Sequence, residues 1–141
     1  MKKEVIATND LMSLVIDSIN NNQKATFKVT GSSMTPFFTH GKTSVTIRKN
    51  ELPYQKYDVI LFKYKESFKL HRIIKISDKM IVARGDALFA KEMISAYDII
   101  GVVESFETDG VITLSNDKSY LKRVRRYLLF KPISLRLRRF K

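Results

Sequence analysis

The chain of 141 residues contains no cysteine and only two histidines. Without cysteine there can be no thiol nucleophile, no cysteine-based zinc site and no disulfide framework. Two histidines are too few for most histidine-rich metal sites. We therefore expect any catalysis to use oxygen nucleophiles, with neither a metal nor another cofactor.

Long apolar runs are also missing. No segment approaches the roughly 18–20 consecutive apolar residues needed to cross a bilayer. Lys2 and Lys3 precede some apolar residues, but Asn9, Asp10 and Asp17 interrupt any signal-peptide core. We expect a cytoplasmic protein, with peripheral binding at the inner face of the membrane as an open alternative.

Charge is distributed unevenly along the chain. The formal net charge is +12, from 26 basic and 14 acidic residues. All the acidic residues lie at or before Asp117, whereas ten Lys or Arg residues lie from Lys118 onward. Residues 1–117 are thus nearly neutral and long enough for one domain, and residues 118–141 form a basic tail. Such asymmetry is typical of a partner-binding segment attached to an ordinary domain.

Hydrophobic periodicity predicts a mainly β fold with a helix at each end. Leu11, Leu14, Val15 and Ile19 recur at helical spacing, with Thr8 or Asn9 as the cap and Asn20 to Asn22 as the end. Alternating and β-branched runs separated by turn signals then predict a mostly antiparallel sheet folded on itself, of α+β class, with strands near residues 27–29, 45–47, 59–62, 68–76, 80–83, 99–103 and 111–114.

Helical spacing returns in the tail. There Leu121, Val124, Tyr127 and Leu128 share one face, and Pro132 is predicted to break the helix and to open a second, shorter one.

The stretch Gly31-Ser32-Ser33-Met34-Thr35-Pro36 holds a candidate nucleophile. Gly31 permits a tight approach of the backbone, and Pro36 biases Thr35 toward an extended conformation. A serine between them is fixed in position, and the backbone N–H groups of Ser32 and Ser33 could stabilise an oxyanion. Taken alone, such a stretch is more often an ordinary loop.

A histidine and an aspartate complete the candidate set. If Phe68, Leu70, Ile74 and Ile76 face the core, alternation places Lys69, His71 and Ile73 on the other side of the strand. A histidine at the rim of a cleft could accept a serine proton near neutral pH. Asp86 directly follows the next strand, where an acid is usually a turn residue.

Together these stretches resemble the S24/S26 serine peptidase superfamily, which includes type I signal peptidases and the self-cleaving domains of LexA-like repressors. The family pattern is a G-x-S-M-x-P box, a strand with the general base next to Arg, a Gly-Asp box and an Ile-Ile-Gly-x-Val strand. The matching segments here are Gly31 to Pro36, His71-Arg72, Gly85-Asp86-Ala87 and Ile99 to Val103.

The resemblance implies a fold, an activity and roles for three side chains. It implies a coiled antiparallel sheet or partly closed barrel, and a serine endopeptidase that cleaves an extended, leader- or signal-peptide-like segment. Ser33 matches the nucleophile and His71 the general base, as in the endoplasmic-reticulum and archaeal signal peptidases. Asp86 matches the acid that supports the histidine, and Lys69 is the fallback base.

The sequence also departs from the family pattern. His40-Gly41-Lys42 replaces the usual Gly-Asp after the serine box, and Tyr57-Asp58 replaces a second one. Leu88 and Lys91 lie near the places where the eukaryotic branch has an asparagine and a later aspartate, with Glu92 and Asp98 as substitute acids. These departures keep a second hypothesis open, a binding module that has lost useful catalysis.

The basic tail suggests several partners besides a peptide or protein substrate. Residues 118–141 combine basic, apolar and aromatic side chains, as in an amphipathic helix at an anionic membrane surface. An acidic protein partner fits equally, and Leu121, Val124 and Leu128 could instead pack against the sheet. A nucleic-acid-binding protein ranks lower, because no groove-reading motif accompanies the charge.

Overall fold

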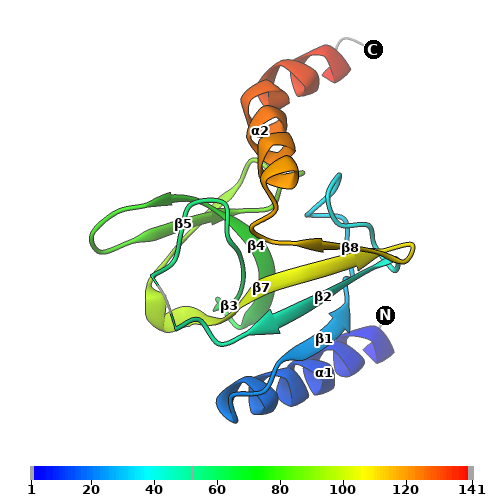
Figure 1. The fold of residues 1–141 in the computed structure, drawn as a ribbon, viewed down its shortest axis with the longest axis vertical. Helices are drawn as coiled ribbons and strands as arrows, with labels where there is room; N and C mark the ends of the chain where they lie inside the picture. The colour runs from blue at the N-terminus through cyan, green and yellow to red at the C-terminus, as the bar shows by residue number, and fades with distance from the viewer. Residues whose placement is uncertain (1, 52, 140–141) are drawn as a thin grey trace.

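The computed structural model describes residues 2–51 and 53–139. Figure 1 shows a curled sheet with one helix alongside it and a second helix projecting from it. In chain order, the elements are α1 (Lys2–Asn20), β1 (Ala25–Lys28), β2 (Thr43–Arg48), β3 (Val59–Tyr64), β4 (Ser67–Ile76), β5 (Ile81–Arg84), β6 (Lys91–Ile94), the short 3₁₀ helix η1 (Ala96–Asp98), β7 (Ile99–Thr108), β8 (Val111–Leu114) and α2 (Lys118–Arg139).

The eight strands of the described chain form one antiparallel sheet that curls into a half-barrel. Its order is β1-β2-β7-β3-β4-β5-β6, and β8 pairs with β7 outside this path. Irregularities in the register where β7 pairs with β2 and β3 accompany the curl, since bulges increase the local twist of a strand. The α+β coiled-sheet fold predicted from the sequence is therefore confirmed.

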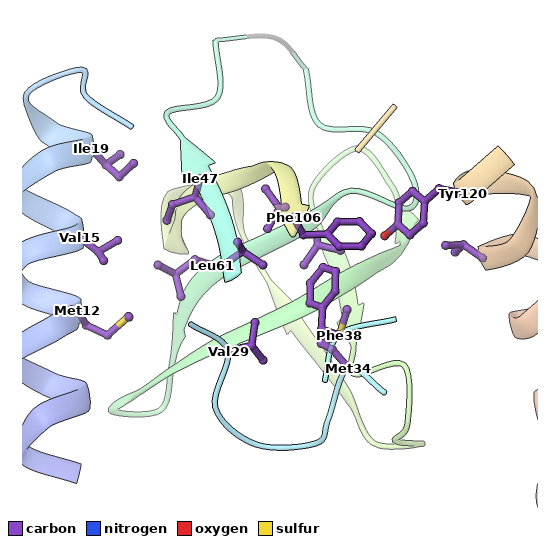
Figure 2. Packing of buried hydrophobic residues seen from close by; sticks show 14 residues of the cluster. Met12, Val15, Ile19, Val29, Met34, Phe38, Ile47, Leu61, Phe106 and Tyr120 are labelled. Carbon is purple, nitrogen blue, oxygen red and sulfur yellow. The ribbon is translucent and has the colours of Figure 1, made fainter. Parts of the chain in front are cut away.

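Helix α1 packs against the sheet through one stripe of side chains. Met12, Val15 and Ile19 are buried at the spacing of a helical face, and Figure 2 shows them pointing toward Ile47 and Leu61. The predicted end of the helix at Asn20 is confirmed. Two details were wrong: the helix begins at Lys2 rather than near Asn9, and Leu14 faces solvent.

Two strand predictions need correction. Strand β6 was not predicted, because Lys91-Glu92-Met93-Ile94 is short and has no β-branched residue before its end. The predicted inward face of β4 is correct only for its first half: Phe68 and Leu70 pack against the main core, but His71 and Ile73 are buried as well and Ile76 is exposed. A register shift between Ile73 and Lys75 interrupts the alternation on which that prediction depended.

Helix α2 is part of the fold along its first turns. Tyr120 and Val124 are almost fully buried in the main core, and Leu121 and Leu128 pack against it. Packing against the domain, one of the two alternatives for this segment, is therefore confirmed. The predicted break at Pro132 was wrong, because α2 continues to Arg139. Proline lacks one N–H donor, but its fixed φ is a helical value.

None of the helices in residues 2–51 and 53–139 is both long and apolar enough to cross a membrane.

Candidate functional site

One cavity brings together the candidate nucleophile and the candidate base. It has a volume of about 250 Å³ and lies between α1, the loop that follows β1, and the strands β3 and β4. Ser33, His71 and Lys69 line it, together with an apolar set made of Met12, Phe27, Val29, Met34, Leu61, Phe68, Leu70 and Leu88. Two side chains that lie 38 positions apart in the sequence thus share one pocket.

The loop that carries Ser33 is held on both sides. Gly31, at φ +85°, donates its N–H to Nδ1 of His40 over 2.7 Å, so the other histidine of the chain has a structural partner. Met34 and Phe38 are buried in the core. Ser33 lies between the exposed Ser32 and the buried Met34, partly buried itself. The loop therefore presents the Ser33 residue at the pocket while its neighbours fix the backbone.

His71 is tied to an acid, and that acid is Glu92. His71 Nδ1 lies 2.6 Å from Glu92 Oε1, and both side chains are buried. A carboxylate on Nδ1 favours the tautomer in which Nδ1 carries the proton and Nε2 is free to accept one. Glu92 comes from β6, which reaches His71 because β5 joins β6 to β4.

The absence of a side chain at Gly85 lets the serine loop and the His71 ring approach each other. A Cβ at position 85 would lie 2.7 Å from the Ser33 carbonyl oxygen and 3.1 Å from His71 Nε2. His71 Nε2 and the Ser33 carbonyl oxygen are thus both close to Gly85. The Ser33 hydroxyl makes no direct hydrogen bond to His71 in the part of the chain described. In enzymes without substrate, catalytic hydrogen bonds are often long.

Asp86 has a different partner from the one predicted. Both of its carboxylate oxygens accept hydrogen bonds from Arg72, at 2.9 and 2.8 Å, and the pair is almost fully buried. Arg72 follows His71 in β4, and neighbouring side chains of a strand point to opposite faces. The assignment of Asp86 as the support of His71 is corrected to Glu92. Asp98, the other substitute acid, is exposed and accepts a hydrogen bond from the Ser95 N–H.

Helix α2 contributes to the Arg72–Asp86 pair and to the turn that follows it. Tyr120 accepts a hydrogen bond from Arg72 Nη2 at 3.0 Å, and the Tyr127 hydroxyl donates to the Asp86 carbonyl at 2.7 Å. Lys131 donates to the Leu88 carbonyl. Because the Ala87 N–H in turn donates to the Ser33 carbonyl over 2.9 Å, α2 supports the turn that positions the serine loop.

Burial and charge shift the pKa values of three groups in this network. Burial alone would lower the pKa of Arg72, but the hydrogen bonds and charge of Asp86 raise it above the ordinary value. Burial raises the pKa of the Tyr120 hydroxyl despite the opposing charge of Arg72. Burial, with a smaller effect from Arg84, lowers the pKa of Lys131 to about 8. Arg72 therefore stays charged at neutral pH.

No family model matches the chain, and no curated protein matches it. The resemblance to signal peptidases thus remains a prediction from the four short segments quoted above. What the structure adds is geometric: Ser33 and His71 line one pocket, and Gly85 of the third segment lies beside both.

Two members of this network would be hard to find by sequence reasoning. Glu92 was only one of two substitute acids, because its strand was not predicted. The sequence signal for this strand is the alternation within Lys91 to Ile94, in which Glu92 and Ile94 occupy the two buried positions. Tyr120 was expected to belong to the tail, and its hydrogen bond to Arg72 spans 48 residues. Nothing local in the sequence indicates that contact.

Proposed function

We propose that the protein is a serine endopeptidase that cleaves an extended segment of a peptide or protein. The main support for the proposal is the position of the two ring nitrogens of His71. Glu92 holds its Nδ1, while its Nε2 lies beside Gly85 in the pocket lined by Ser33. A serine needs such a base, because its hydroxyl is a weak nucleophile at neutral pH.

The residues take complementary roles in the proposed reaction. The Ser33 oxygen attacks the carbonyl carbon of the substrate as His71 Nε2 takes the hydroxyl proton. His71 then donates that proton to the leaving amine, and water hydrolyses the acyl-enzyme by the same route. Glu92 orients the ring and stabilises its charged form. Asp86 acts as a positioning residue, because Arg72 holds it and it fixes the turn beside Ser33.

Backbone N–H groups near Ser33 are suited to bind the oxyanion. The N–H groups of Ser32, Ser33 and Met34 donate to no acceptor that the structure describes. Thr35, the next residue, already donates to the Ser32 carbonyl. Unsatisfied donors next to a nucleophile are available for the negative charge that develops in acyl transfer.

The sheet offers a place for an extended substrate. β1 is the end strand of the sheet and pairs only with β2 among the described strands. Its residue Phe27 and the following Val29 line the pocket. An extended peptide added to the outer edge of β1 would form main-chain hydrogen bonds and would pass the pocket that holds Ser33.

A peptide-library digest tests the proposal. Wild-type protein is incubated with a mixture of extended peptides, and the products are identified by mass spectrometry. We expect cleavage that is lost in Ser33→Ala and retained in Ser32→Ala, a matched change at the neighbouring serine. Glu92→Gln should lower kcat by about 10²–10⁴-fold, as expected when a general base loses its orientation. It should change KM little.

Two outcomes would count against the enzyme. Cleavage that persists in Ser33→Ala would remove the serine from the mechanism. A well-folded wild-type protein that cleaves no peptide would favour the binding module, in which the fold is kept without catalysis.

A further inference from the structure

The pocket that holds Ser33 also holds a cation that the proposed reaction does not use. Lys69 lies on β4 two residues before His71, and both line the cavity. No register shift separates them in the pairing with β3, where Phe62 faces Lys69 and Ile60 faces His71. The two side chains therefore leave the strand on the same face.

Lys69 has no counter-charge among the residues that the structure describes. No acidic residue is among the described residues that line the cavity. The ion pairs of the described chain join Lys24 and Arg48 to Glu104, His71 to Glu92 and Arg72 to Asp86, and none involves Lys69. Glu92 and Asp86 are thus already engaged, and no other carboxylate of the described chain pairs with this ammonium group.

The cavity beside Lys69 is lined mainly by apolar side chains. Lys69 is partly buried, and its strand neighbours Phe68 and Leu70 line the same cavity. Removing a charge from water costs free energy unless an opposite charge or hydrogen bonds replace the solvent. A substrate group with a negative charge would supply both when it enters the pocket.

We propose that Lys69 binds a carboxylate of the substrate close to the cleaved bond. This inference rests on the proposed function and adds a substrate class to it, peptides with a carboxylate near the scissile bond. An extended chain advances about 3.3 Å per residue, and Lys69 and His71 lie two positions apart on the strand. The carboxylate therefore lies within about two residues of the bond that is cleaved. It can belong to an Asp or Glu side chain or to the C-terminus of the peptide.

A binding experiment tests this without requiring catalysis. Full-length Ser33→Ala protein is titrated into acetylated, amidated octapeptides of Ala, Ser and Val that carry one Glu or one Gln and a neutral dye. Binding is followed by fluorescence anisotropy at 0.15 M salt, which screens distant charges. We expect the best Glu peptide to bind about tenfold more tightly than its Gln partner, as for a charge-assisted hydrogen bond.

Matched variants assign the preference to one side chain. Lys69→Met in the Ser33→Ala background should abolish the difference between Glu and Gln. Lys75→Met, which removes an exposed lysine of the same strand, should keep it. A second set of Gln peptides has a free C-terminus in place of the amide. Tighter binding of this set than of the amidated Gln peptides would identify the bound carboxylate as the chain end.

Several results would overturn the inference. These are equal binding of the Glu and Gln peptides with no gain from a free C-terminus, a preference that survives Lys69→Met, and no binding up to millimolar concentration. A cleavage assay on the protein with Ser33 intact distinguishes failure of this inference from failure of the proposed peptidase activity. Cleavage without a carboxylate preference would refute only the role of Lys69. Loss of cleavage of all peptides in Lys69→Met would instead make Lys69 the base.

Discussion

Replacing Asp86 by asparagine tests whether this residue supports the fold or orients His71. The change removes the negative charge from a pair in which Arg72 is fully buried and Asp86 is 1% exposed. It leaves the shape of the side chain almost unchanged. Arg72 would then keep its charge without a counter-charge, with only the Tyr57 carbonyl, the Tyr120 hydroxyl and the new amide oxygen as acceptors.

The expected loss of stability is large. Removing one partner of a buried ion pair costs about 3–5 kcal/mol, because the remaining charge stays desolvated. Domains of this size have a free energy of unfolding of about 5–15 kcal/mol, so Asp86→Asn should remove about a fifth of the total or more. At about 0.3 kcal/mol/K of unfolding entropy for a chain of this length, the melting temperature should fall by roughly 10–17 °C.

Urea unfolding followed by circular dichroism measures this loss. Asp78→Asn makes the same chemical change at an exposed position and should shift stability by less than about 0.5 kcal/mol. A loss below about 1 kcal/mol in Asp86→Asn would refute the structural role. An Arg72→Met/Asp86→Leu double variant should be destabilised by less than the two single changes added together, because no unpaired charge is left.

Three further predictions concern the neighbouring elements. Gly85→Ala should cost about 1–3 kcal/mol and abolish cleavage, because its Cβ would lie 2.7 Å from the Ser33 carbonyl oxygen; an unchanged melting temperature would contradict this. The pKa of Lys131 is about 8 in the fold and 10.5 in the unfolded chain, so the unfolded state binds more protons between these values. The free energy of unfolding of wild type, relative to that of Lys131→Met, should therefore rise from pH 8 to 10.5. A difference between the two proteins that does not change with pH would exclude the lowered pKa of Lys131. Leu129→Ser/Phe130→Ser, on the exposed face of α2 beside Arg125 and Arg126, should weaken sedimentation with phosphatidylserine vesicles at least about fivefold. Equal sedimentation of the variant would rule out this face as the membrane contact.

Local signals in the sequence predicted the position of the serine loop and the positions of most strands along the chain. Gly31 has the positive φ that a tight turn requires, so a turn signal correctly marked the loop of Ser33. The run Val59 to Phe62 is buried throughout, as its continuous apolar pattern indicates. In these segments, backbone preference and burial point to the same structure.

The partners of His71 and Asp86 could not be predicted in this way. Glu92 occupies an inward position of a four-residue strand, where a charged residue is usually expected to face solvent. It is buried because His71 Nδ1 donates a hydrogen bond to its carboxylate, and that contact forms only after β5 and β6 pair. Similarly, Asp86 follows a strand as many turn residues do, and only the tertiary position of Arg72 gives it a buried partner.

Covalent labelling by a fluorophosphonate, located by mass spectrometry, tests most directly whether Ser33 and His71 act together. We predict one phosphonyl adduct on Ser33 in wild type, strongly reduced labelling in His71→Ala, and normal labelling in Ser32→Ala. An adduct on another residue, equal labelling of Ser33 with and without His71, or no adduct on the folded protein would contradict this prediction.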